Sequence, residues 1–166
     1  MRHSAPGAHT LLSRHMKASI INAGDGSHEH PTQALLDAYT LRKRFGKLEG
    51  LRVAIVGDIR NSRVVRSNLW LLNRMGAKVT LVGPPTLVPQ EMKATWPAIE
   101  ICHDFDAVLP EQDAIMMLRA QFERGTGAYI PGQGEYSRFY QLNTARMQRA
   151  RKDVAVSYTH LTLPTN

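Results

Sequence analysis

Two arginines stand just after segments that have the character of buried strands. Arg63 follows an apolar run that ends in Gly57-Asp58, and Arg119 ends the run 113–119. A guanidinium presents a rigid fork of donors that matches a carboxylate or a phosphate. If both runs are parallel strands, their carboxyl ends meet at one edge of the sheet. The pair therefore predicts a site for a dianionic ligand, and the alternative for each arginine alone is a surface salt bridge.

A second group of polar residues surrounds the predicted start of a helix. His30 precedes Pro31, and proline fits the first helical position because its missing N–H has no helical partner there. A helix N-terminus attracts anions and disfavours a protonated histidine, so a neutral imidazole at His30 would suit polarising a carbonyl oxygen. Gln33 lies one turn further on and can face the same ligand. The alternative is a histidine that only caps the helix, beside a surface glutamine.

The stretch His28-Glu29-His30 contains residue types that bind metals, but it does not predict a metal site. Ligands two positions apart at a loop–helix junction do not converge easily, and no third ligand is evident in the sequence. The single cysteine, Cys102, excludes an internal disulfide and a cysteine-based metal cluster. Because it follows the apolar stretch Ile99-Glu100-Ile101, we expect a buried structural thiol rather than a catalytic one.

Strand-like and helix-like segments alternate along the chain. Apolar, mostly β-branched runs predict strands at 51–58, 78–83, 99–103, 113–119 and 153–156. Helical patterns predict helices at 32–45, 62–75, 89–95 and 137–151, with a long glycine-containing loop at 121–134. This order is typical of an α/β protein with a parallel, Rossmann-like sheet flanked by helices. Only the first glycine of a G-x-G-x-x-G fingerprint is present, at Gly57, so no dinucleotide site is expected.

Composition bounds the partners of the chain. Hydrophobic residues make up 43% of the 166, and no apolar run approaches the roughly 20 residues that span a bilayer. The first residues lack the layout of a secretory signal. The net charge of +7 is spread over helix-like segments, without zinc-finger spacing or a stripe of basic and aromatic residues. We therefore expect a cytoplasmic protein that binds neither nucleic acid nor membranes.

Several blocks of sequence, in order over residues 1–156, resemble the aspartate carbamoyltransferase family. The blocks are Arg2-His3-Ser4, Asn22-Ala23-Gly24-Asp25-Gly26, His30-Pro31-Thr32-Gln33, Val56-Gly57-Asp58, Ser62-Arg63-Val64, Arg66-Ser67-Asn68 and the stretch 117–124. The AGDG and HPTQ blocks are specific to this family and its close relatives. The Arg-x-Gln-x-Glu-Arg block, which begins at Arg119, separates it from ornithine carbamoyltransferases, which have a Ser-Met-Gly stretch there.

The resemblance implies an enzyme that transfers the carbamoyl group of carbamoyl phosphate to L-aspartate, an early step of pyrimidine synthesis, without a metal or organic cofactor. It assigns Arg2 and His30 to carbamoyl phosphate, with His30 donating to the carbonyl oxygen, and it assigns Gln33 to the carbamoyl nitrogen. Catalysis would then rest mostly on positioning and on electrostatic stabilisation of a tetrahedral intermediate.

The resemblance also assigns the amino-acid side of the site. Arg63 and Arg119 would bind the two carboxylates of aspartate, with Gln121 close by. This assignment agrees with the dianion site that the two arginines predict without reference to any family.

The resemblance divides the chain into parts of two domains. Residues 1–45 correspond to the end of the carbamoyl-phosphate domain with an interdomain helix, and residues 46–156 correspond to the aspartate-binding domain. Residues 157–166 fit neither and are interpreted as a non-native tail. Family members are longer: they carry a phosphate-binding loop, and they form trimers in which a neighbouring subunit completes the site.

The chain alone is therefore expected to be an inactive fragment. The absence of an interdomain partner should leave the apolar face of helix 32–45 exposed. Two other interpretations stay open. The chain could be a non-catalytic module that binds anions or amino acids, or it could derive from a related carbamoyltransferase with another amino-acid substrate.

Overall fold

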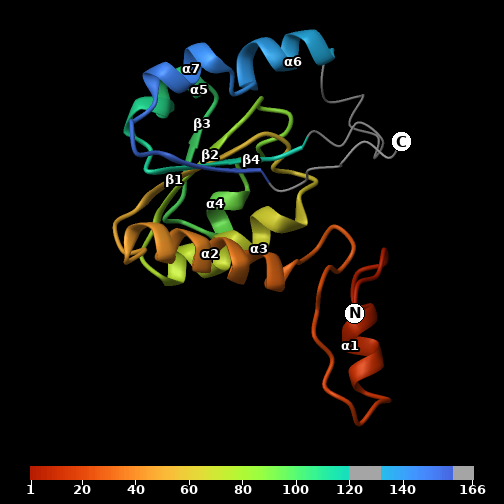
Figure 1. The fold of residues 1–166 in the computed structure, drawn as a ribbon. Helices are drawn as coiled ribbons and strands as arrows, with labels where there is room; N and C mark the ends of the chain where they lie inside the picture. The colour runs from red at the N-terminus through yellow and green to blue at the C-terminus, as the bar shows by residue number, and fades with distance from the viewer. Residues whose placement is uncertain (120–131, 159–166) are drawn as a thin grey trace, which may run out of the picture.

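Five parallel strands form one sheet in the order β3-β2-β1-β4-β5 (Figure 1). They are β1 Arg52–Val56, β2 Lys78–Val82, β3 Glu100–Cys102, β4 Ala114–Met117 and β5 Ala155–Tyr158. The structure is a computed structural model that describes residues 1–119 and 132–158. The predicted α/β class with a parallel sheet is confirmed. Strand order reverses between β1 and β4, because the chain first builds outward from β1 to β3 and then returns to the other side of β1.

The central strand explains why its sequence is a continuous apolar run. Val53, Ala54, Ile55 and Val56 are all completely buried, since helices cover both faces of the sheet. Val53 and Ile55 belong to the cluster that includes Leu69 and Leu72, whereas Ala54 and Val56 belong to a second cluster around Phe105 and Leu109. Because successive side chains of β1 point to opposite faces of the sheet, this one strand contributes to two separate hydrophobic clusters.

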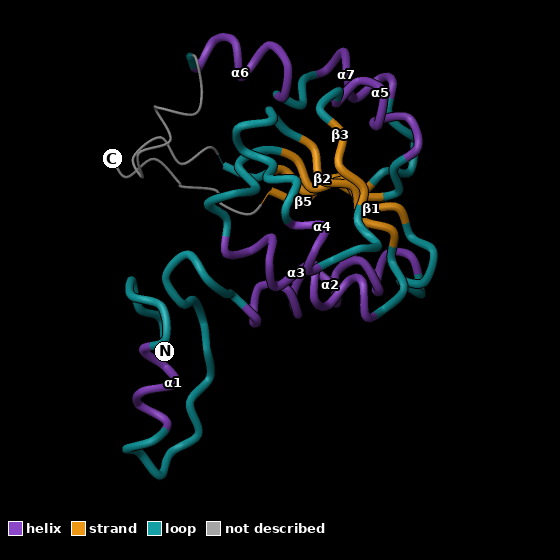
Figure 2. The backbone as a smooth tube through the Cα atoms, turned by 180° about the vertical axis from the view of Figure 1, so that it is seen from behind, coloured by secondary structure: helices purple, strands orange, loops and turns teal. Residues whose placement is uncertain are grey.

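Helices lie in two layers, one on each side of the sheet (Figures 1 and 2). On one side lie α2 Pro31–Phe45, α3 Arg63–Arg74 and α4 Met92–Thr95. On the other side lie α5 Phe105–Val108, α6 Gln133–Tyr140 and α7 Thr144–Arg149, with a short 3-10 turn at Leu109–Glu111. Figure 2 shows the same two layers from behind. In the part of the chain that the structure describes, no helix is long and apolar enough to cross a membrane.

Two predicted helices differ from those observed. The helix expected at 89–95 is reduced to the single turn of α4. The helix expected at 137–151 is two helices, because Asn143 takes an extended conformation and its side chain accepts a hydrogen bond from the Arg146 N–H at 3.0 Å. That contact is an N-cap, which begins a new helix.

Three smaller expectations also need correction. Strand β5 runs to Tyr158, so Ser157 and Tyr158, which were expected to lie outside the fold, pair with β4. Cys102 is half-buried rather than buried, because it lies on the edge strand β3. The apolar residues of helix 32–45 do not share one face, because Leu41 is buried whereas Leu35, Leu36 and Tyr39 are exposed.

The outer face of α2 is apolar and exposed. Leu35, Leu36 and Tyr39 retain 60%, 56% and 64% of their accessible surface, whereas Ala34, Ala38 and Leu41 pack inward. The exposure expected for a helix without its interdomain partner is therefore present in the structure.

Residues 1–30 form an arm that extends from the helical layer of α2 and α3 (Figures 1 and 2). It contains a short helix that the sequence did not predict, α1 Ala8–Ser13. The buried carboxylate of Asp25 holds the arm together by accepting from the Gly7 N–H at 2.7 Å and by lying 3.1 Å from Nδ1 of His28. The His28 ring therefore contacts the carboxylate of Asp25.

An ion-pair cluster fastens α5 to α7. The carboxylate of Asp106 accepts from Nε and Nη2 of Arg146 at 3.0 and 2.8 Å, and Arg149 adds a bond at 2.8 Å. The bonds from Arg146 hold the pKa of Asp106 below its usual value, with the charges of Arg146 and Arg149 adding to the effect. Since the folded-state pKa is the lower one, the stabilisation is present above the unfolded pKa of about 3.9 and is lost as pH falls below it.

We predict that Asp106→Asn lowers the free energy of unfolding by about 1 kcal/mol at pH 7, a modest value because the carboxylate is 36% exposed. The loss should shrink when urea unfolding is measured at progressively lower pH, below about 4. Glu111→Gln, which breaks an exposed pair with Arg52, is the control and should change stability much less. An Asp106→Asn effect that is independent of pH would contradict the prediction.

Candidate functional site

The site begins at the carboxyl ends of β1 and β4, where the strand order reverses. Beyond β1 the chain continues into Gly57 and the fully buried Asp58, and beyond β4 it continues into Leu118 and Arg119. The Leu118 N–H donates to the Val56 carbonyl at 2.8 Å, so the two strand ends stay paired up to this point. In open α/β sheets, ligands bind in the crevice at such a reversal point.

Gly57 is required where β1 ends. Its φ is +126°, and an added Cβ would lie 2.9 Å from the Leu118 carbonyl oxygen and 2.9 Å from the Tyr136 hydroxyl. Gly46, which ends α2, has a comparable positive φ of +81° but open space around an added Cβ. The two glycines therefore separate backbone strain from steric contact.

We predict that Gly57→Ala lowers the free energy of unfolding by about 2–4 kcal/mol, because strain and a backbone clash add. Gly46→Ala should lose less, about 1–2 kcal/mol, because only the strain of a positive φ opposes it. Urea unfolding of the two variants measures the difference. Equal losses would show that the crowding at Gly57 carries no energetic weight.

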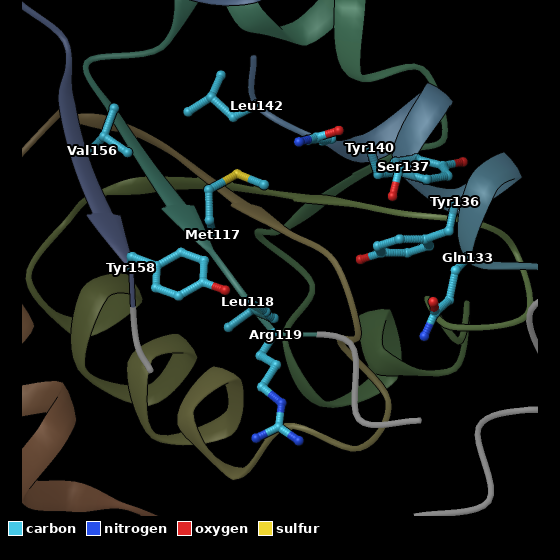
Figure 3. Close-up of a pocket in the computed structure, with 11 residues that line it drawn as sticks. Met117, Leu118, Arg119, Gln133, Tyr136, Ser137, Tyr140, Leu142, Val156 and Tyr158 are labelled. Carbon is cyan, nitrogen blue, oxygen red and sulfur yellow. The ribbon is translucent and has the colours of Figure 1, made fainter. Parts of the chain in front are cut away.

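A cavity of about 520 Å³ opens between this edge and α6 (Figure 3). Its lining consists of Met117, Leu118, Arg119, Gln133, Tyr136, Ser137, Tyr140, Gln141, Leu142, Val156 and Tyr158. Among the described residues that line it, Arg119 is the only charged one, so this lining favours an anion. Arg119 follows the end of a strand, as the sequence predicted, and it lies beside a cavity. Gln121, the other candidate in this region, lies outside the described residues.

Arg63 lies at the first turn of α3, under the loop of the arm. It is buried, with 8% of its surface accessible, and its Nη1 donates to the Gly26 carbonyl at 3.2 Å. An added Cβ at Gly24 would lie 3.0 Å from Cζ of Arg63 and 3.2 Å from Cγ of Arg2. The structure thus places Arg2 and Arg63 beside the same glycine, although Arg2 begins the arm and Arg63 begins α3.

His30 precedes α2 as predicted, and a residue of α3 holds its backbone. The His30 N–H donates to the Ser67 hydroxyl oxygen at 2.8 Å, and that hydroxyl donates to the carboxylate of Glu29. The His30 ring lies 3.2 Å from the Thr32 hydroxyl, measured from Nδ1. Ser67 therefore holds the His30 backbone and Thr32 contacts its imidazole, at a helix N-terminus where the helix dipole favours a partner with negative charge.

Gln33 is turned along its own helix. Its amide donates to Asp37 at 3.0 Å, and Asp37 also accepts from the buried Asn68 at 2.8 Å. Burial raises the pKa of Asp37, although the bonds from Asn68 and Gln33 oppose the rise. In this structure the buried carboxylate of Asp37 takes the Gln33 amide, and the expectation that Gln33 faces the same ligand as His30 stays a prediction.

Sequence reasoning gave a role to Arg63 but none to Arg66 and Ser67, which share a face of α3 with it. Arg63, Arg66 and Ser67 stand at positions i, i+3 and i+4 of this helix, which places them on one face. All three contact the arm: Arg63 the Gly26 carbonyl, Arg66 the Ser27 carbonyl and Ser67 the backbone of His30. The i, i+3, i+4 spacing was the available signal.

Within the described ranges, no group of three or more His, Cys, Asp or Glu side chains is arranged to hold a metal ion.

The fold and the candidate site define a class of protein: an α/β protein with Arg119 beside a cavity at a sheet switch point, and with Arg2 and Arg63 near one glycine where an arm meets the sheet domain. Family comparison makes this specific. Residues 1–43 match the aspartate/ornithine carbamoyltransferase carbamoyl-P binding domain, and residues 49–158 match the Asp/Orn binding domain of the same family. The chain belongs to the aspartate/ornithine carbamoyltransferase family.

Individual relatives of the chain are aspartate carbamoyltransferase catalytic subunits. The chain is 53% identical over 159 residues to the aspartate carbamoyltransferase catalytic subunit of Salinispora tropica, covering 95% of this chain and 52% of the relative. It is 58% identical over 149 residues to that of Thermobifida fusca, covering 90% of this chain and 47% of the relative. The chain thus spans about half the length of the curated relatives that it matches.

Solved structures show the same relation. Aspartate transcarbamoylase from Trypanosoma cruzi in complex with carbamoyl phosphate superposes with a TM-score of 0.85 at 33% identity, over 100% of this chain and 54% of that one. The same enzyme in complex with carbamoyl phosphate and aspartate gives a TM-score of 0.82 over 100% of this chain and 55% of that one.

Proposed function

We propose that this chain is part of an aspartate carbamoyltransferase, which transfers the carbamoyl group of carbamoyl phosphate to the amine of L-aspartate. The observation that carries the proposal is the placement of Arg63. It lies at the contact between the carbamoyl-phosphate segment, through Gly24 and Gly26, and the sheet domain that carries Arg119. A carbamoyl donor and a dicarboxylic acceptor must meet at such a boundary.

The chemistry requires only groups that this arrangement supplies. Arg63 and Arg119 bind the carboxylates of aspartate as rigid, permanently charged forks. His30, at a helix N-terminus, donates to the carbonyl oxygen of the carbamoyl group, which gains negative charge as the aspartate amine attacks. Arg2 binds the phosphate beside it. Gln33 binds the carbamoyl nitrogen after its amide leaves Asp37, and Gln121 completes the aspartate side.

The remainder of the parent protein completes the site. We propose a cytoplasmic homotrimer that serves pyrimidine synthesis, in which the phosphate-binding loop and a neighbouring subunit supply the remaining contacts to carbamoyl phosphate. The 166-residue chain alone is inactive on this proposal, because it spans about half of its relatives. The exposed outer face of α2 supports the proposal, since Leu35, Leu36 and Tyr39 form an apolar surface that another domain would cover.

A chimera tests the substrate assignment. Residues 1–156 of this chain replace the matching part of the Salinispora tropica enzyme, whose own sequence remains on both sides. Carbamoyl transfer is then measured with L-aspartate and with L-ornithine as acceptors. We expect product with aspartate and none above background with ornithine. Preference for ornithine, or activity with neither, would contradict the proposal.

A binding module is the second candidate function, and the cavity beside Arg119 favours it. The described residues that line this cavity belong to the sheet domain and to α6 and the loop after it, and none of them belongs to the arm. The isolated chain should therefore retain weak affinity for a dicarboxylate even without turnover. Titration with succinate, followed by the shifts of backbone amide resonances near Arg119, measures this affinity.

A further inference from the structure

The cavity beside Arg119 has a wall that no assignment above uses. Four residues of α6 line it, at positions i, i+3, i+4 and i+7: Gln133, Tyr136, Ser137 and Tyr140. This spacing places them on one face of the helix. The face is polar but uncharged, and the floor opposite is apolar, formed by residues such as Met117 and Leu142. Such a wall suits a short ligand with an anionic group and an aliphatic stem.

Tyr136 is the residue of this wall that reaches furthest into the site. Figure 3 shows its phenol crossing the cavity from α6 toward Leu118 at the end of β4. Its hydroxyl would lie 2.9 Å from a Cβ added at Gly57, so it stands over the end of β1 as well. One hydroxyl therefore reaches both strand ends that border the switch point, and the absence of a side chain at Gly57 makes room for it.

The hydroxyl is a donor over the whole working range of pH. Burial raises the pKa of Tyr136, and the nearby charge of Asp58 raises it further. A phenol that stays protonated can donate to a carboxylate, and such a charge-assisted bond is stronger than one between neutral groups. Its neighbour Tyr140 differs, because the Tyr140 hydroxyl already donates to the His103 carbonyl at 3.0 Å.

We propose that Tyr136 is a substrate-binding residue whose hydroxyl donates to a carboxylate of the amino-acid substrate held by Arg119. This inference rests on the proposed function and deepens it, since it names the wall that distinguishes the amino-acid substrate. Arg119 and Tyr136 line the same cavity, so one short dicarboxylic amino acid bound there can contact both. A substrate with a cationic side chain is repelled by Arg119.

The test uses the chimera described above, with Tyr136→Phe as the variant and Tyr140→Phe as the matched control. Both substitutions remove one phenolic hydroxyl from the same face of α6 and keep the ring. We expect Tyr136→Phe to raise the KM for L-aspartate about tenfold or more, the value of a hydrogen bond to a charged group. The KM for carbamoyl phosphate should stay within about twofold, and Tyr140→Phe should leave both constants within about twofold.

The outcomes separate this inference from the proposed function. An active chimera in which Tyr136→Phe and Tyr140→Phe behave alike would overturn the inference and leave the proposed function standing. A Tyr136→Phe variant that raises both KM values equally would also overturn it, because that pattern indicates a structural role. An unsubstituted chimera without turnover would overturn the proposed function and the inference with it.

Discussion

Replacing Arg63 by alanine is expected to lower kcat/KM for L-aspartate about a thousandfold in the chimera. The guanidinium is buried at the boundary between the arm and the sheet domain, where water competes little for its donors. Two hydrogen bonds to a carboxylate contribute about 3–6 kcal/mol, which corresponds to roughly a hundredfold to ten-thousandfold. Steady-state kinetics with varied aspartate measures the loss.

The comparison with Arg66 separates substrate binding from attachment of the arm. Arg66 lies one turn further along α3 and also donates to the arm, at the Ser27 carbonyl, but it is only half-buried. Arg66→Ala should reduce kcat/KM by less than about fivefold. Arg63→Lys should remain well below the unsubstituted enzyme, because an ammonium lacks the planar fork. Equal losses for Arg63→Ala and Arg66→Ala would mean that Arg63 serves only to hold the arm.

Replacing His30 by alanine is expected to lower kcat about a hundredfold to a thousandfold, the usual effect of removing one donor to a developing oxyanion. The KM for aspartate should change little, because the proposed function gives His30 a contact to the carbamoyl group and not to aspartate. His28→Ala is the control: its ring lies two residues earlier, is largely exposed and pairs with Asp25. A drop for His30→Ala that appears in KM rather than in kcat would contradict the assigned role.

Periodicity and punctuation were enough to predict the sheet. Buried parallel strands require continuous apolar runs, and the run that includes Val53 and Ile55 has no competing interpretation at its length. The predicted helix boundaries were wrong where a short polar side chain began a new helix. Asn143 lies inside a stretch with a helical pattern, but its side chain accepts a hydrogen bond from the Arg146 N–H and caps a new helix. The spacing of apolar residues does not predict such a local hydrogen bond.

The candidate site was predictable in its residue types and only partly in its contacts. Strand topology placed Arg119 at a sheet edge, and a proline after His30 marked the start of α2. Tertiary contacts decided the rest. The Gln33 amide donates to Asp37, and no sequence pattern indicated that Arg2 and Arg63 would both lie beside Gly24. Contacts between segments far apart in sequence depend on the packed fold rather than on local spacing.

Formation of carbamoyl aspartate by the isolated chain, assayed beside the chimera, tests the central claim most directly. The account predicts no turnover by the 166-residue chain and clear turnover by the chimera, because residues 1–156 hold the aspartate side of the site and depend on the remaining half for the phosphate side. Clear turnover by the isolated chain, abolished by His30→Ala, would contradict the account, since the site would then be complete within this half.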